Sequence, residues 1–143
     1  MRNTRLPIAL VVLATALAAA AACTDQLPAE DRRILDAVPA AKLSVDNLSH
    51  DYQADAKAAD KRYWGKAIEI SGVVSGTRDE PMGAALLFND KNGALIVEAD
   101  LLDDQAKAIL ASTADSRRTT LRCYCGGASS GHVVLKSCIA PKP

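Results

Sequence analysis

The cysteines are the residues of this chain best suited to chemistry. Cys23 stands alone near the N-terminus, whereas Cys123, Cys125 and Cys138 lie close together near the C-terminus. In an oxidising compartment, three neighbouring thiols form one disulfide and leave one thiol over. With His132, the same cluster could instead hold zinc through thiolates and an imidazole. The C-x-C spacing differs from the C-x₂₋₄-C spacing of structural zinc sites, so we expect no metal.

The register of one hairpin decides which cysteines pair. One candidate is a tight turn centred between Gly131 and His132. It would place Cys125 directly opposite Cys138, at the Cβ separation that a disulfide needs. A turn centred one residue earlier would place Cys123 opposite Cys138 instead. The spacing alone leaves both pairings open.

Other catalytic groups are few. His50 lies beside Asp51, but neighbours in sequence on a helix point in different directions. The carboxylate pairs at 79–80 and 103–104 fit a loop and the start of a helix. The sequence contains no nucleophile motif, phosphate-binding loop or His-rich metal motif. We therefore expect no enzymatic activity and no cofactor.

Residues 1–22 have the order of a secretory signal. Arg2 and Arg5 supply positive charge, residues 6–17 are mostly apolar, and residues 18–22 are all alanine. The apolar run is shorter than the roughly 20 residues that a membrane-spanning helix needs, and much of it is weakly hydrophobic alanine. We therefore expect export rather than a transmembrane anchor.

Cys23 stands where a lipid would be attached. The residues before it resemble a bacterial lipobox, in which small residues precede a cysteine that becomes the lipidated N-terminus, although Ala20 replaces the usual leucine. The alanine run would also suit an ordinary Ala-x-Ala cleavage site. The polar linker after Cys23 favours lipidation, and Thr24 in place of aspartate favours the outer membrane. We expect a lipid-anchored envelope protein, with a soluble periplasmic protein as the alternative.

Charge and aromatic content argue against a surface that coats nucleic acid. The 17 basic and 17 acidic residues cancel, and the part from Cys23 onward carries a net charge of −2. Such a surface needs clustered positive charge that displaces counterions from phosphates. One local group combines basic and aromatic side chains and is the candidate ligand surface: Arg117, Arg118, Arg122 and Tyr124. The charge balance therefore argues against nucleic acid as a partner of this chain.

The patterning divides the chain into a signal (1–22), a flexible tether (23–42) and one domain (43–143). The tether is rich in proline, alanine and charge, with at most one loose helical turn. After Ser44, apolar residues at intervals of three and four predict a helix that ends at Gly65. The predicted strands are 68–75, 84–88, 94–99, 119–125 and 133–139, with a short helix at 103–111.

Five strands with a helix between the third and fourth have the order of an OB-type barrel. We therefore predict a mainly β domain: a five-stranded OB-like barrel with an N-terminal helix and a short helix between strands 3 and 4. Gly72, in the middle of the first strand, predicts a bend or a bulge there.

Two runs of the domain carry a family resemblance. They are Leu43-Ser44, Leu48, Tyr52, Ala58-Ala59-Asp60, Tyr63, Gly65-Lys66 and Ile68–Val74 at the opening, and Cys125-Gly126 and Val133–Ile139 at the close. They resemble the small bacterial tRNA-anticodon-binding-like OB-fold proteins, often predicted lipoproteins of unknown function, over residues 43–140. The resemblance implies the fold. It says little about function, because the family has no established catalytic residues and OB barrels host many ligands. It also favours a Cys125–Cys138 disulfide, whose loop of about 12 residues would stabilise the domain by roughly 3 kcal/mol.

These observations together favour a non-enzymatic module. We expect a membrane-tethered OB-like binding or structural protein of the bacterial cell envelope, whose partner is an unknown envelope protein or a small ligand. The alternative is an OB domain that binds nucleic acid or an oligosaccharide.

Overall fold

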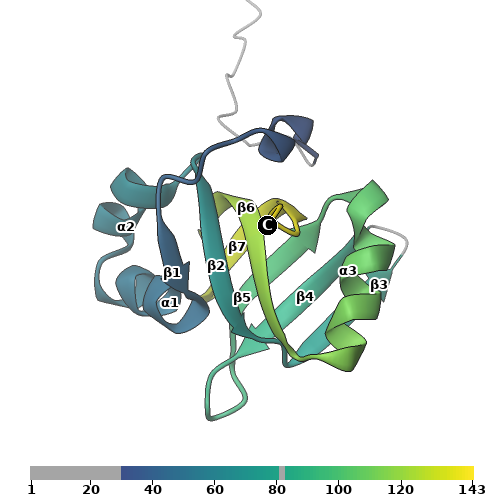
Figure 1. Ribbon diagram of the computed structural model, residues 1–143. Helices are drawn as coiled ribbons and strands as arrows, with labels where there is room; N and C mark the ends of the chain where they lie inside the picture. Colours follow the sequence, from purple (N-terminus) through teal and green to yellow (C-terminus); the bar gives the residue numbers. More distant parts are fainter. Residues whose placement is uncertain (1–29, 81–82) are drawn as a thin grey trace, which may run out of the picture.

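The computed structural model of the protein describes residues 30–80 and 83–143. The predicted signal and Cys23 lie outside the described residues. Seven strands form one sheet, which three α-helices and a short 3₁₀ helix accompany within the described ranges (Figure 1). In chain order the elements are η1 (Arg32–Leu35), β1 (Lys42–Ser44), α1 (Val45–Ala54), α2 (Ala56–Tyr63), β2 (Ala67–Val73), β3 (Gly76–Glu80), β4 (Gly83–Asn89), β5 (Leu95–Leu101), α3 (Asp103–Asp115), β6 (Arg118–Ser129) and β7 (His132–Ile139).

The β6–β7 hairpin stands at the centre of the sheet. The strand order is β1-β2-β6-β7-β5-β4-β3. The pairs β1–β2 and β5–β7 are parallel, and the other neighbours are antiparallel. The predictions of a mainly β domain and of a helix between the third and fourth predicted strands are confirmed, because α3 joins β5 to β6.

The predicted five-stranded closed barrel is wrong in both strand number and closure. The sheet is open, and the residues expected to form a turn after the first strand form β3 instead. The chain bends between β2 and β3, where the Val74 N–H donates to the Arg117 carbonyl and the Ser75 N–H donates to the Leu87 carbonyl. Residues 67–80 therefore supply two strands that pair with different partners, β6 and β4.

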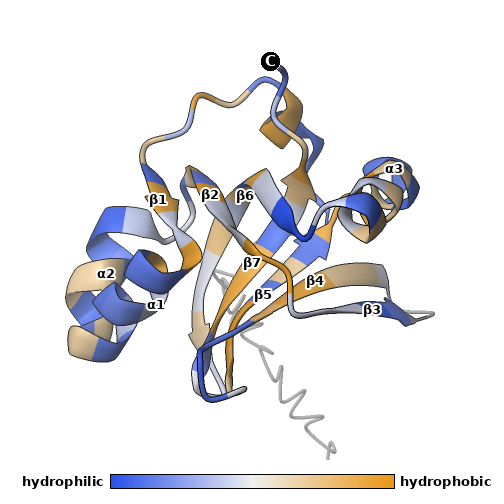
Figure 2. Cartoon of the chain, turned by 60° about the horizontal axis from the view of Figure 1, so that its bottom comes forward, coloured by the Kyte–Doolittle hydropathy of each residue, from blue (hydrophilic) through white to orange (hydrophobic). Residues whose placement is uncertain are grey.

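The predicted N-terminal helix is split in two. Ser44 caps α1 as expected, because its Oγ accepts a hydrogen bond from the Asn47 N–H at 3.1 Å. Asp55 then ends α1 and caps α2, since its carboxylate accepts from the Ala58 N–H at 3.0 Å. The apolar face of α1 packs on the inner face of the sheet, and Leu48 is fully buried there. Figure 2 shows the apolar colouring that runs along β5 and β7.

The second half of the predicted flexible tether is packed on the domain. The Asp31 N–H donates to Ser137 Oγ at 2.7 Å, and Ile34 of η1 is fully buried beside Leu102 and Ile139. The Arg33 side chain hydrogen-bonds both oxygens of the Asp31 carboxylate and lowers its pKa. Residues 30–42 are therefore part of the folded unit, and the hydrogen bond to Ser137 and the buried side chain of Ile34 both hold them there.

Gly72 permits a close approach rather than a bulge. The pairing of β2 with β6 continues without a register shift from Ala67 to Val73, so the predicted bulge at Gly72 is wrong. A Cβ at Gly72 would lie 2.6 Å from Val45 Cγ2 and 3.3 Å from the Phe88 ring. Helix α1 can therefore lie against β2 only because this position has no side chain.

We predict that Gly72→Ala lowers the free energy of unfolding by about 1–3 kcal/mol, because overpacking displaces α1 from the sheet. Gly76→Ala is the matched control, since a Cβ there meets nothing closer than Leu87 Cδ1 at 3.9 Å. Chemical denaturation of both variants measures the difference. Equal stability of the two variants would contradict the packing described for Gly72.

Candidate functional site

The structure joins Cys123 to Cys138, so the expected Cys125–Cys138 disulfide is wrong. Ser130 and Gly131 form the turn, with φ of 52° and 86°, as a two-residue hairpin turn with two left-handed residues requires. This is the earlier of the two turn positions that the spacing left open. The two Cα atoms of the disulfide lie 4.2 Å apart across neighbouring strands.

Two bulges lie between the turn and the disulfide, and their register shifts cancel, so the position of the turn alone sets this pairing. The register of β6 against β7 shifts between Cys125 and Ala128, and shifts back between Arg122 and Tyr124. Ser137, in β7, has φ of 53° and is buried. At this second irregularity the Ser137 hydroxyl meets the Asp31 backbone, while the next residue faces the core and forms the disulfide.

Cys125 is a free, fully buried thiol. Its sulfur lies 3.3 Å from the Tyr52 hydroxyl, which donates to Asp60 Oδ1 at 2.9 Å. Because that hydroxyl proton is directed to Asp60, the thiol is the donor to the tyrosine oxygen. Burial raises the pKa of Cys125, and burial with the hydrogen bond to Cys125 raises the pKa of Tyr52. A protonated, enclosed thiol is a core residue and not a nucleophile.

The zinc alternative loses two of its ligands to the disulfide. Cys123 and Cys138 are bonded to each other, and His132 contacts Glu98 instead of a cysteine. Within residues 30–80 and 83–143, no three side chains of the metal-binding types converge.

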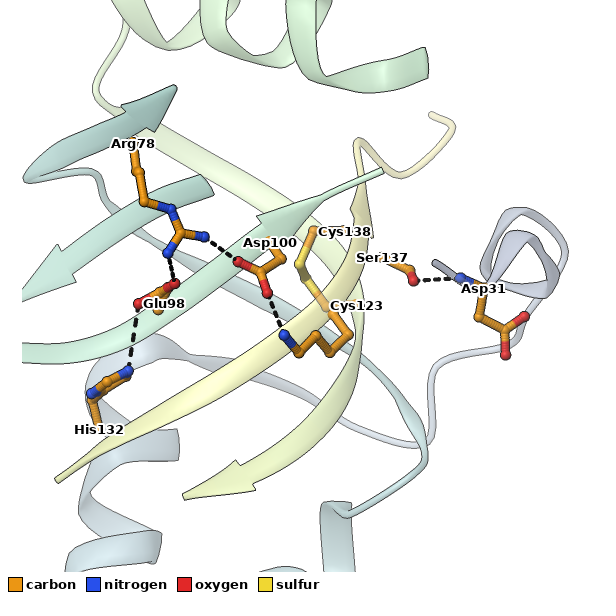
Figure 3. Close-up of polar contacts among 9 residues, drawn as sticks. Asp31, Arg78, Glu98, Asp100, Cys123, His132, Ser137 and Cys138 are labelled. Carbon is orange, nitrogen blue, oxygen red and sulfur yellow. Dashed lines mark hydrogen bonds and ion pairs between the residues drawn. A yellow bond between two sulfur atoms is a disulfide. The ribbon is translucent and has the colours of Figure 1, made fainter. Parts of the chain in front are cut away.

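A network of five charged or ionisable side chains crosses the outer face of the sheet (Figure 3). They are Arg78 on β3, Glu98 and Asp100 on β5, and His132 and Lys136 on β7. Arg78 binds Glu98 at 2.5 Å through Nη1 and Asp100 at 2.8 Å through Nη2. Lys136 Nζ lies 2.5 Å from Asp100, and His132 Nε2 lies 3.5 Å from Glu98. We call these five residues the charged face.

The geometry of the charged face gives it mixed polarity. Each carboxylate lies between two basic side chains, and the carboxylates of Glu98 and Asp100 are only 16% and 22% exposed. Neighbouring ion pairs hold one another in place, so the donors and acceptors are ordered before any ligand arrives. Two carboxylates at the centre of the face repel a polyanion, whereas hydroxyl and amide groups can bond to both kinds of side chain.

The structure brings three residues of the predicted ligand surface to one face of β6, because Arg118, Arg122 and Tyr124 occupy even-numbered positions of that strand. Arg117 precedes the strand. Arg122 lies 3.8 Å from the Glu69 carboxylate, and Tyr124 packs against the apolar cluster around Ile34. Two residues of this surface are thus already in contact with other parts of the domain.

The sequence held a weak signal for the charged face. Glu98 and Asp100 are two residues apart in a strand whose other side chains are mainly apolar, so both point away from the core. Arg78 was missed because its segment was expected to be a turn. His132 was considered only as a zinc ligand.

The mainly β sheet with an inserted helix defines an OB-like domain. The chain belongs to the tRNA_anti-like family, whose model matches residues 1–139. No curated protein and no solved structure matches the chain. In the part of the chain that the structure describes, no helix is long and apolar enough to cross a membrane.

The raised pKa of Cys125 predicts a stability that falls with pH. The folded protein keeps this thiol proton, whereas the unfolded chain loses it above the ordinary thiol value of about 8.5. Below that pH the contribution is fully present. Above it, the free energy of unfolding should fall by up to about 1.4 kcal/mol per pH unit. Guanidinium denaturation between pH 7 and pH 9.5 measures this decline, and Cys125→Ala is the control in which it should vanish. Parallel curves for the two proteins would contradict the prediction.

Proposed function

We propose that the protein is a lipid-anchored, non-enzymatic binding module of the bacterial cell envelope, and that the charged face is its ligand site. One observation supports the ligand site above all. Arg78, Glu98, Asp100 and Lys136 form a continuous ion-pair network across β3, β5 and β7. OB-like domains use the outer faces of such curved sheets to bind chain-like ligands.

The mixed charge of this face supports a polar ligand of low net charge, of which an oligosaccharide is the favoured class. A nucleic acid would have to bring phosphates close to Glu98 and Asp100, at a cost in electrostatic free energy. The basic residues of the predicted ligand surface lie elsewhere, since Arg122 is near Glu69 and Arg117 and Arg118 stand at the start of β6.

The proposal of lipid anchoring rests on Cys23 and the alanine run before it. Asp31 and Ile34 fix the segment that begins at Glu30 to the domain, so few residues separate Cys23 from the folded part of the chain. The chain between Cys23 and Glu30 can span at most about 25 Å. An anchor at Cys23 would therefore keep the domain close to the bilayer surface.

Lipidation is tested by growing cells with an alkynyl fatty acid. The wild-type chain should be labelled and sediment with membranes, whereas Cys23→Ser should lose the label, because the acylated sulfur is absent. Cys125→Ser is the matched control and should keep the label, since that thiol is buried. Equal labelling of wild type and Cys23→Ser, or a soluble protein that begins at Cys23 with a free thiol, would overturn the anchor.

The ligand class is tested by neutralising the two carboxylates of the charged face. The wild-type chain should not bind a single-stranded oligonucleotide measurably. Glu98→Gln/Asp100→Asn should bind it with a log–log salt slope of about −1.4, because Arg78 and Lys136 become free to meet two phosphates. Asp103→Asn/Asp115→Asn changes the net charge equally on α3 and is the control.

Fluorescence anisotropy across a range of salt concentrations measures both variants. Salt-dependent binding by the wild-type chain would favour the nucleic-acid alternative. Equal binding by the two double variants would show that the charged face is not the site.

A further inference from the structure

The strand β3 stands at one end of the sheet. It pairs with β4 and with no other strand among the described residues. The outer edge of such a strand presents backbone N–H and C=O groups without partners, and these can pair with an added strand. β3 is therefore a backbone template five residues long.

Residues of β3 and of the C-terminal half of α3 line one groove. The groove has a volume of about 430 Å³. Gly76, Thr77 and Asp79 line it from the strand side, and Leu110, Ala114 and Arg117 line it from the helix side. A backbone edge with an apolar wall beside it is the arrangement that binds extended peptides by strand addition.

The two ends of this groove carry opposite charge. The Arg117 carbonyl accepts the Val74 N–H at 2.8 Å, which places Arg117 where β3 begins. Asp79 lies near the other end of the strand. Both residues are exposed, and neither forms an ion pair with another described residue. The groove is thus positive where β3 begins, at Arg117, and negative at Asp79. At 3.3 Å per residue, these two ends are about 13 Å apart.

We propose that this groove binds an extended peptide segment of another protein, which joins β3 as an antiparallel strand. Antiparallel to β3, such a segment runs from Asp79 towards Arg117. Its basic residue must therefore come first, with an acidic residue four positions later on the same face. A small apolar residue midway between them would face Leu110 and Ala114. This site is separate from the charged face and does not depend on the lipid anchor.

A second copy of the chain fits this groove less well than a peptide. By two-fold symmetry an antiparallel copy of β3 would form both Asp79–Arg117 contacts, so charge does not exclude it. It would, however, bring its own α3 against the first molecule, because residues of α3 line the same groove as β3 in each copy.

Two fluorescein-labelled peptides of identical composition test the proposal, with the full chain purified in detergent. The peptide Lys-Thr-Val-Thr-Glu should bind saturably, and about tenfold more tightly than Glu-Thr-Val-Thr-Lys, because two ion pairs become two like-charge contacts. Asp79→Lys/Arg117→Glu should reverse this preference. The reversal is a gain of binding, so a folding defect cannot produce it.

Ala114→Arg, at an exposed helix position, should fill the groove and remove the binding of both peptides while far-UV circular dichroism stays unchanged. Absence of binding, equal affinity for the two peptides, or binding that survives Ala114→Arg would overturn the proposal. A dimer in sedimentation that Ala114→Arg abolishes would also overturn it, and would assign the groove to a second copy of the chain.

Discussion

The positive φ of Ser137 is the constraint that positions both the N-terminal segment and the disulfide, on opposite faces of β7. A left-handed residue other than glycine is costly in a strand, and it persists only where its surroundings hold it. Here two bonds do so from opposite sides. The hydroxyl of Ser137 accepts the Asp31 N–H, and the next residue, Cys138, is tied to Cys123. The same irregularity therefore fixes the N-terminal segment outside and the cross-strand disulfide inside.

The central position of this hairpin extends its influence to both proposed surfaces. β7 carries Lys136 and His132 of the charged face and pairs directly with β5, which carries Glu98 and Asp100. β6 pairs with β2, from which the chain bends into β3 and its groove. The packed segment at Asp31 meets the end of the same hairpin. The positions of the charged face, the β3 groove and the N-terminal segment thus all depend on how β6 pairs with β7.

Local patterns in the sequence predicted five of the seven strands and α3, because strand and helix periods depend on near neighbours. They missed the short strands β1 and β3 and joined α1 to α2. Contacts between residues far apart in sequence could not be predicted from such local patterns. The disulfide partner depends on which two residues form the hairpin turn, and residue spacing allowed two turns one residue apart. The network from Arg78 to Asp100 and Lys136 joins three strands far apart in sequence. The packing of Ile34 was hidden because a single buried side chain leaves no periodic pattern.

Non-reducing peptide mapping of the purified chain tests the hairpin geometry most directly. It should recover one crosslinked pair of peptides, containing Cys123 and Cys138, with Cys125 unlinked. Cys123 and Cys125 are separated by Tyr124 alone, so cleavage after that tyrosine distinguishes them. A crosslink between Cys125 and Cys138 would contradict the bulged register and, with it, the placement of Ser137 between the core and the N-terminal segment.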